Sequence, residues 1–109
     1  DKMGEGVTGF KAGQRAGIAW LHSACGTCKF CRSGRENLCE TARFTGWDVN
    51  GGFAEYTTVP EEFAFALGDR MSFGKMAPLM CPGIAGYRAL RLTGAGAGDT
   101  LGLYGYGPT

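Results

Sequence analysis

Four of the five cysteines of this chain lie within sixteen residues, in the segment ACGTCKFCRSGRENLC at positions 24–39. The pattern is C-x2-C-x2-C-x7-C, and its members are Cys25, Cys28, Cys31 and Cys39. Each two-residue spacing lets a pair of sulfurs meet at one ion through a tight turn, and the longer spacing lets the fourth sulfur return to it. The pattern predicts a closed, tetrahedral structural zinc site, which fixes a loop and leaves no position for a substrate.

Other interpretations of the cluster stay open at this point. A [4Fe–4S] site also uses C-x2-C-x2-C, but its fourth cysteine usually follows after about three residues or lies far away. Two disulfides are less favoured because no secretion signal precedes the cluster. Four thiolates and one Zn²⁺ carry a charge of about −2, which nearby bases can offset, although the same bases also fit a solvated surface. These bases are Lys29, Arg32 and Arg35.

Composition excludes several classes of protein. The 109 residues suit one small domain, and 11 basic against 10 acidic side chains argue against a dedicated nucleic-acid binder. The 20 glycines favour a fold with many turns over a helical bundle. No apolar run reaches the roughly 18 residues of a membrane span, and we expect an intracellular location. Both ends look cut, so we expect a piece of a longer protein.

The pattern of residues predicts short strands, a helix and turns. Strands are expected at 14–21, within 48–59 after a turn at Asn50-Gly51-Gly52, at 61–67 and at roughly 100–104. A helical stripe of three- and four-residue steps follows the third strand, and its members are Met76, Met80, Ile84, Tyr87 and Leu90.

Pro82 lies inside this helical stripe, and proline cannot donate a backbone hydrogen bond. We therefore predict two helical pieces, the second with Pro82 as its first residue and Gly94 as its left-handed cap.

The fifth cysteine, Cys81, lies 42 residues after Cys39. A lone cysteine in an apolar stretch is often a small buried apolar residue. A helix that starts at Pro82 would make Cys81 its N-cap, where the helix dipole favours a thiolate. A metal ligand and a nucleophile both require this form, and the sequence does not separate the two. The only histidine, His22, is interpreted as a surface residue rather than as a further ligand.

The predicted strand at 100–104 is followed by Gly105-x-Gly107. A strand followed by Gly-x-Gly is the first half of a dinucleotide-binding fingerprint, in which the glycines permit a tight turn and close approach to a pyrophosphate. The same residues also fit an ordinary loop.

Taken in order, the cysteine pattern, the segment APLMCPGIAGYRAL and the final glycine turn resemble the zinc-dependent alcohol dehydrogenases of the medium-chain dehydrogenase/reductase superfamily. The bacterial propanol-preferring type is most similar. The likeness extends over nearly the whole chain and includes WLHSACGTCKFCRSGRENLC (20–39) and GGFAEYTTVP (51–60).

The resemblance implies a mostly β, GroES-like catalytic domain over residues 1–92, with a zinc lobe at 25–39. A linking helix then leads into residues 93–109, the first strand of an α/β Rossmann domain. The structural zinc would be held by Cys25, Cys28, Cys31 and Cys39. Cys81 matches a ligand of the catalytic zinc, Gly105 and Gly107 match the NAD(P) loop, and Trp20 lies where the family often places a substrate-pocket side chain.

The implied activity is hydride transfer between a small alcohol or aldehyde and NAD(P), in a cytoplasmic homo-oligomer without nucleic-acid or membrane partners. The family's first catalytic cysteine and its Gly-His-Glu segment would precede Asp1, so this chain alone is expected to be inactive. The chain departs from the family's usual residues at Gln14, Pro82 and Ala85. The alternative from another class is a non-catalytic four-cysteine zinc-binding module; quinone reductase relatives generally lack the cysteine lobe.

Overall fold

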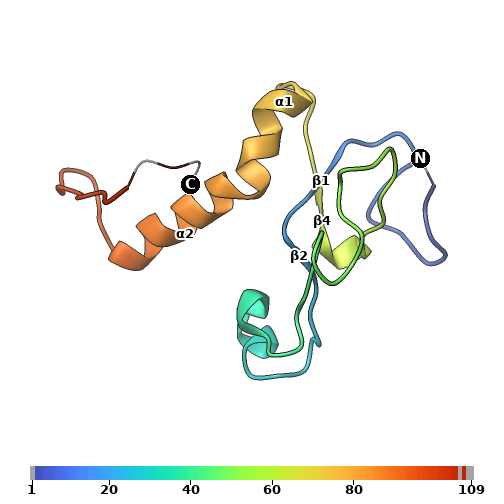
Figure 1. Cartoon of the computed structure of the whole chain (residues 1–109), viewed down its shortest axis with the longest axis horizontal. Helices are drawn as coiled ribbons and strands as arrows, with labels where there is room; N and C mark the ends of the chain where they lie inside the picture. The colour runs from blue at the N-terminus through green and yellow to red at the C-terminus, as the bar shows by residue number, and fades with distance from the viewer. Residues whose placement is uncertain (1, 106, 108–109) are drawn as a thin grey trace. The chain divides into compact units, whose positions relative to one another are not determined.

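The structure is a computed structural model that describes residues 2–105 and 107. The chain divides into two compact units, Asp1–Asp69 and Arg70–Thr109 (Figure 1). Each unit is described by itself below.

The first unit contains two small antiparallel sheets. Strand β1 (Ala16–Ile18) pairs with β4 (Ala64–Ala66), and β2 (Leu21–Ser23) pairs with β3 (Arg43–Phe44). The single strand predicted at 14–21 is thus divided, because the chain leaves one sheet after Ile18 and enters the other at Leu21.

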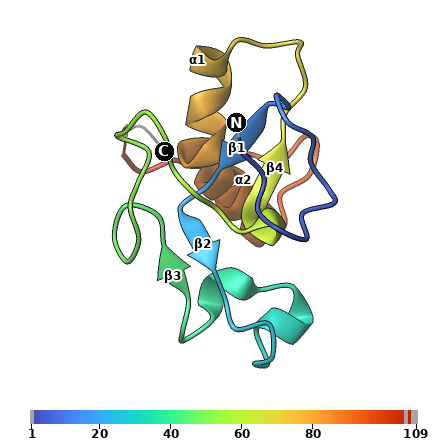
Figure 2. The same ribbon diagram turned by 90° about the vertical axis from the view of Figure 1, so that its right-hand side faces the viewer.

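The second of these sheets forms the base of the cysteine lobe, which we define as residues 25–39. Strand β2 leads into the lobe and β3 leads out of it, as Figure 2 shows. Within the lobe the chain forms two 3₁₀ turns, η1 (Cys31–Ser33) and η2 (Glu36–Leu38). The pairing of β2 with β3 therefore brings the two ends of the lobe together.

Two of the predicted strands need correction in this unit. The segment at 61–67 starts as a 3₁₀ turn, η3 (Glu61–Phe63), and becomes extended only in β4. The strand expected within 48–59 is absent among the described residues, and Phe53 there is fully exposed. A β-propensity pattern forms a strand only when a neighbouring strand supplies hydrogen bonds, and in the described residues this segment makes only an isolated bridge between Thr45 and Val49.

The second unit is helical in its first part, as predicted. It contains α1 (Phe73–Met76), the 3₁₀ turn η4 (Ala77–Met80) and α2 (Pro82–Thr93). Helix α2 has Pro82 as its first residue and Cys81 as its N-cap, and the Ala85 N–H donates to the Cys81 carbonyl at 3.1 Å. Gly94 ends the helix with a φ of 71°. The two-piece interpretation and both helix ends are confirmed.

The strand predicted at 100–104 is also not formed in the described part of the chain, where these residues make no ladder and Leu103 is exposed. A first strand of a parallel sheet needs a second strand beside it. The Rossmann assignment of residues 93–109 and the division after residue 92 stay predictions.

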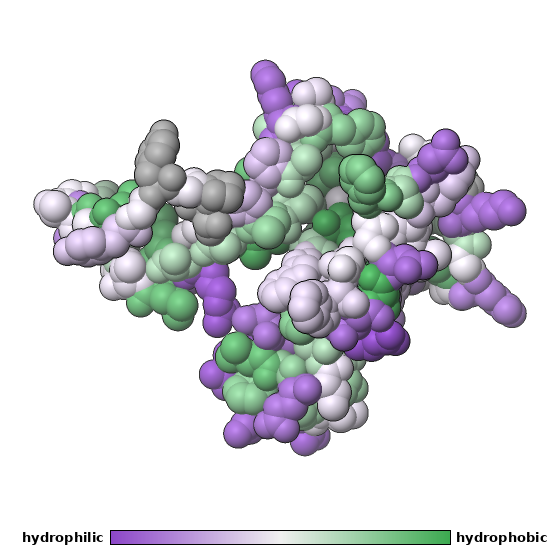
Figure 3. Space-filling model, viewed as in Figure 1, coloured by the Kyte–Doolittle hydropathy of each residue, from purple (hydrophilic) through white to green (hydrophobic). Residues whose placement is uncertain are grey.

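Few apolar side chains are buried in the described residues. They are Cys31, Cys39 and Met76, at 8%, 7% and 9% exposure. Many large apolar side chains lie at the surface instead, as the green regions of Figure 3 indicate. In the described part of the first unit, the buried apolar side chains are therefore those of Cys31 and Cys39, both in the cysteine lobe.

Among the described helices, α2 is the longest, and no helix is long and apolar enough to cross a membrane.

Replacing Gly51 with alanine should destabilise the loop after β3. A Cβ there would lie 2.9 Å from the Gly46 Cα, a backbone atom that cannot move aside easily. We expect Gly51→Ala to lower the free energy of unfolding by about 1–3 kcal/mol, measured by urea denaturation with tryptophan fluorescence.

The matched control is Gly52→Ala, because a Cβ at Gly52 meets nothing within 4 Å. Its free energy of unfolding should change by no more than about 1 kcal/mol. Equal effects of the two substitutions would contradict the described loop.

Candidate metal centre

The four sulfurs of the cysteine lobe converge on one point. The Sγ atoms of Cys25, Cys28, Cys31 and Cys39 all lie within 4.8 Å of one another. Cys31 Sγ is 3.5 Å from Cys28 Sγ and 3.9 Å from Cys25 Sγ. Thiolates about 2.3 Å from a zinc ion in a regular tetrahedron are about 3.8 Å apart. All five cysteines are free thiols, so the cluster has the spacing of a metal site and not that of disulfides.

Backbone N–H groups within the cluster point at the sulfurs. The Cys28 N–H donates to Cys25 Sγ at 3.3 Å, and the Cys31 N–H donates to Cys28 Sγ at 3.5 Å. Gly26 has a φ of 72°, which lets the chain turn sharply between Cys25 and Cys28. Both C-x2-C spacings therefore produce the same local turn, in which donors face the thiolates and stabilise their charge.

The fourth sulfur returns through the two 3₁₀ turns. Gly34 ends η1 with a φ of 67°, and its N–H donates to the Cys31 carbonyl at 3.1 Å. The Cys39 N–H then donates to the Glu36 carbonyl at 3.0 Å at the end of η2. This path brings Cys39 back beside the other three sulfurs after the seven-residue spacing.

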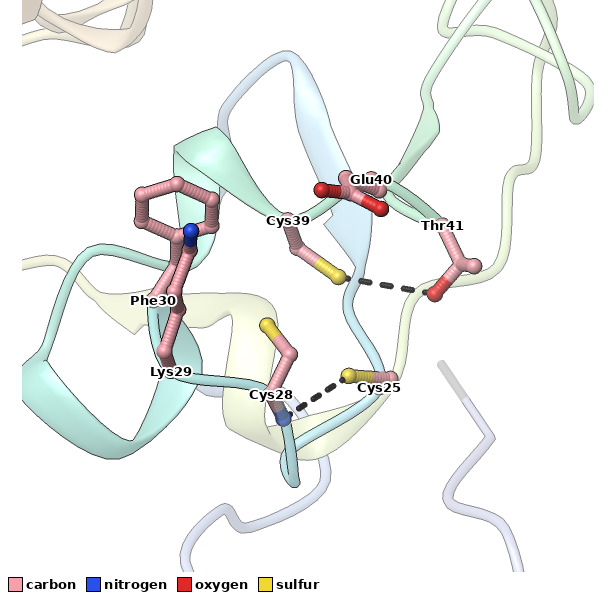
Figure 4. A pocket seen from close by; sticks show the side chains of 7 residues that line it. All are labelled: Cys25, Cys28, Lys29, Phe30, Cys39, Glu40 and Thr41. Carbon is pink, nitrogen blue, oxygen red and sulfur yellow. Dashed lines mark hydrogen bonds between the residues drawn. The ribbon is translucent and has the colours of Figure 1, made fainter.

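Two threonines that the sequence analysis did not single out contact the outer cysteines. The Thr27 hydroxyl donates to Cys25 Sγ at 3.6 Å, and the Thr41 hydroxyl lies 3.5 Å from Cys39 Sγ. Thr41 lines a pocket of about 400 Å³ over the cluster, together with three of the cysteines (Figure 4). Each threonine lies two positions after a cysteine, and this shared spacing is the signal that could have identified them.

The thiols differ in acidity because their surroundings differ. Hydrogen bonds from the Thr27 N–H, the Thr27 hydroxyl and the Cys28 N–H lower the pKa of Cys25 to about 5. The Thr41 hydroxyl is the main cause that lowers the pKa of Cys39. Burial, followed by the Cys28 side chain, raises the pKa of Cys31 to about 12. A divalent cation would displace the remaining protons, because metal ligands must be deprotonated.

The donor set fits zinc. Four sulfur ligands with this spacing and no oxygen donor among them favour a soft or borderline ion in tetrahedral geometry. Because all four positions would be filled by protein, such a site fixes the loop and does not activate water. The bases Lys29, Arg32 and Arg35 lie within the lobe, and the cations of Lys29 and Arg35 lie 5.0 and 5.6 Å from the centroid of the Phe30 ring.

The other predicted site residues lie apart from this cluster or in the second unit. Trp20 is 58% exposed, and its ring stacks on Phe44 with centroids 4.3 Å apart. His22 is half-buried rather than fully exposed, and its Nδ1 has no hydrogen-bond partner among the described residues.

The predicted residues of the second unit are Cys81, Gly105 and Gly107, and the cluster lies in the first unit. Cys81 is exposed at its N-cap position, and its sulfur makes no capping hydrogen bond. Gly105 has a φ of 100°, which favours glycine.

The fold and the site together give a four-cysteine lobe, set on small antiparallel sheets, that could hold a metal ion. Residues 1–69 match the family described as the alcohol dehydrogenase GroES-like domain. This chain belongs to that family.

Curated relatives are alcohol dehydrogenases. The chain is 55% identical to the "Probable alcohol dehydrogenase AdhA" of Mycobacterium tuberculosis, over 90% of this chain and 28% of that protein. It is 44% identical to an alcohol dehydrogenase of Geobacillus stearothermophilus, over 98% of this chain and 32% of that protein. The chain thus spans about a third of the length of these relatives.

Solved structures agree with this assignment. The chain superposes with a TM-score of 0.77 on CAD from Helicobacter pylori complexed with NADP(H), at 28% identity over 85% of this chain and 29% of that one.

In the chain without bound metal, Cys25 should react with iodoacetamide faster than Cys31. Cys25 is exposed with a pKa of about 5, so it is already a thiolate at neutral pH. Its rate should stay nearly constant from about pH 6.5 to about pH 8.5. Cys31 is buried with a pKa of about 12, so its rate should rise about tenfold per pH unit. Peptide mapping by mass spectrometry measures both rates, and equal pH profiles would contradict the described environments.

Proposed function

We propose that this chain is part of a zinc-dependent alcohol dehydrogenase that transfers hydride between a small alcohol or aldehyde and NAD(P). The observation that carries the proposal is the convergence of four cysteine sulfurs within 4.8 Å in a chain of the alcohol dehydrogenase GroES-like family. The names of the relatives and the NADP(H) bound by the Helicobacter pylori protein support the reaction class.

The exposed apolar surface supports a place for this chain within a larger protein, in which another element would cover that surface. Along α2 the residues of the predicted stripe remain exposed, among them Ile84, Tyr87 and Leu90. Contiguous apolar surface of this kind usually marks a face that another element covers.

The cluster would hold the structural zinc. Cys25, Cys28, Cys31 and Cys39 supply its four thiolates, and the ion keeps the lobe folded without entering the reaction.

Cys81 would hold the second, catalytic zinc. Cys81 occupies the N-cap position of the twelve-residue helix α2, where its sulfur makes no capping hydrogen bond and so stays available to an ion. Its exposure leaves the sulfur accessible to an ion whose other ligands come from elsewhere.

Gly105 and Gly107 would form the start of the cofactor loop. The positive φ of Gly105 supports a tight turn at this position, as a pyrophosphate-binding loop requires. Trp20 would contribute to the substrate pocket, with its ring orientation set by the stacked ring of Phe44.

When bound, a catalytic zinc supplies Lewis-acid polarisation of the alcohol oxygen, and the nicotinamide accepts the hydride. This chain's own part is to bind and orient. Cys81 binds the reactive ion, the glycines admit the cofactor, and the cysteine lobe keeps its loop in one conformation. We also propose a cytoplasmic homo-oligomer.

Metal counting on the longer enzyme, compared with its Cys81→Ala variant, tests this proposal. We expect two zinc ions per subunit in the unchanged enzyme, and one zinc ion with loss of NAD(P)-linked alcohol oxidation in the variant. The measurements are zinc content by mass spectrometry and the appearance of reduced nicotinamide.

The control variant is Cys39→Ser, which should lose the other zinc ion and lower the thermal midpoint. If Cys81→Ala leaves both zinc content and activity unchanged, Cys81 has no catalytic role. One zinc ion per subunit together with no binding of reduced nicotinamide would support the non-catalytic zinc-binding module instead.

A further inference from the structure

A network of polar contacts holds the segment between Cys31 and Cys39. The Arg35 N–H donates to the Phe30 carbonyl at 2.9 Å, and Arg35 Nε donates to the Ser33 hydroxyl at 3.0 Å. The Ser33 hydroxyl in turn is 2.9 Å from the Lys29 carbonyl and 3.0 Å from the Phe30 carbonyl, between which it shares its proton. The Arg35 guanidinium also lies over the Phe30 ring, 5.6 Å from its centroid.

This network joins the chain before Cys31 to the chain after it. Lys29 and Phe30 precede Cys31, whereas Ser33 and Arg35 follow it. The contacts therefore connect residues on both sides of Cys31 and hold η1 in its turn conformation. The Arg35 carbonyl accepts the Leu38 N–H at 2.9 Å, so the turn that ends at Cys39 starts from the main chain of a residue whose side chain is held by Ser33.

The direction in which Cys39 enters the cluster depends on this arrangement. Cys39 is 7% exposed, and its sulfur lies within 4.8 Å of the other three after the chain has passed through both η1 and η2. Gly34 permits the sharp turn between η1 and η2, but it supplies no side-chain contact to fix it. The contacts of Arg35 and Ser33 supply that restraint.

We propose that Arg35 and Ser33 are positioning residues of the zinc site, which preorganise the return of Cys39 to the other three thiolates. This inference rests on the proposed structural zinc. It differs from simple charge compensation, in which every base of the lobe contributes alike.

Arg32 provides the comparison that separates these two roles. It carries the same charge, lies in η1 three residues before Arg35, and is exposed. No side-chain hydrogen bond or ion pair of Arg32 is present in the described part of the chain. Charge compensation predicts equal losses for Arg32 and Arg35, whereas positioning predicts a loss at Arg35 alone.

The test measures the zinc dissociation constant of the 109-residue chain by competition with a chromophoric chelator. We expect Arg35→Ala, Arg35→Lys and Ser33→Ala to weaken zinc binding by about tenfold or more, as loss of outer-shell contacts does. Arg32→Ala should stay within about threefold of the unchanged chain. Ser33→Thr keeps the hydroxyl and should restore most of the affinity that Ser33→Ala loses.

Cobalt binding gives a second readout, the absorption spectrum, which a general loss of stability would not change in the same way. The thiolate-to-cobalt charge-transfer absorption reports how many thiolates bind, and Cys39→Ser defines the spectrum of a three-thiolate site. At saturating Co²⁺, Arg35→Ala should shift from the four-thiolate spectrum toward that of Cys39→Ser, whereas Arg32→Ala should not.

Equal affinities of the Arg35→Ala and Arg32→Ala variants, or unchanged affinity of Arg35→Lys, would overturn the positioning role and leave the zinc site intact. An unchanged chain that binds no zinc would instead overturn the proposed structural zinc, and the inference with it. If Arg35→Ala does not fold, the comparison of Ser33→Ala with Ser33→Thr decides the question.

Discussion

The convergence of four cysteine sulfurs is the interaction on which the first unit depends. Two short antiparallel sheets and a set of loops bury little apolar surface, and the buried apolar side chains of this unit are Cys31 and Cys39. Small domains with so little core usually need a disulfide or a metal ion for stability. A zinc ion held by four thiolates would replace the missing core of the lobe, and β2 and β3 would transmit that restraint to the sheet.

The second unit places a single cysteine at the start of a helix instead of in a cluster. Cys81 lies at the point where a 3₁₀ turn gives way to a twelve-residue helix, and Pro82 fixes that point because it cannot continue a helix from the preceding turn. The sulfur is thus presented at the start of a helix. In the proposed enzyme, one set of thiolates maintains structure while a separate thiolate serves the reaction.

The sequence predicted those features that local chemistry decides. Cysteine spacing predicted the cluster, and Pro82 and Gly94 predicted both ends of α2, because a ligand set and helix caps depend on a few neighbouring residues. The prediction of a strand within 48–59 was wrong, because strand formation depends on a distant partner strand. The role proposed for Arg35 was also out of reach, since its charge was evident in the sequence but its contacts with Ser33 and Phe30 exist only in the folded lobe.

X-ray absorption at the zinc edge, on the zinc-loaded chain, tests the central claim most directly. The account predicts one shell of four sulfur atoms at about 2.3 Å, with no nitrogen or oxygen neighbour. A shell that contains fewer than four sulfurs, or an oxygen or nitrogen at about 2.0–2.1 Å, would contradict a closed site formed by the four cysteines of the lobe.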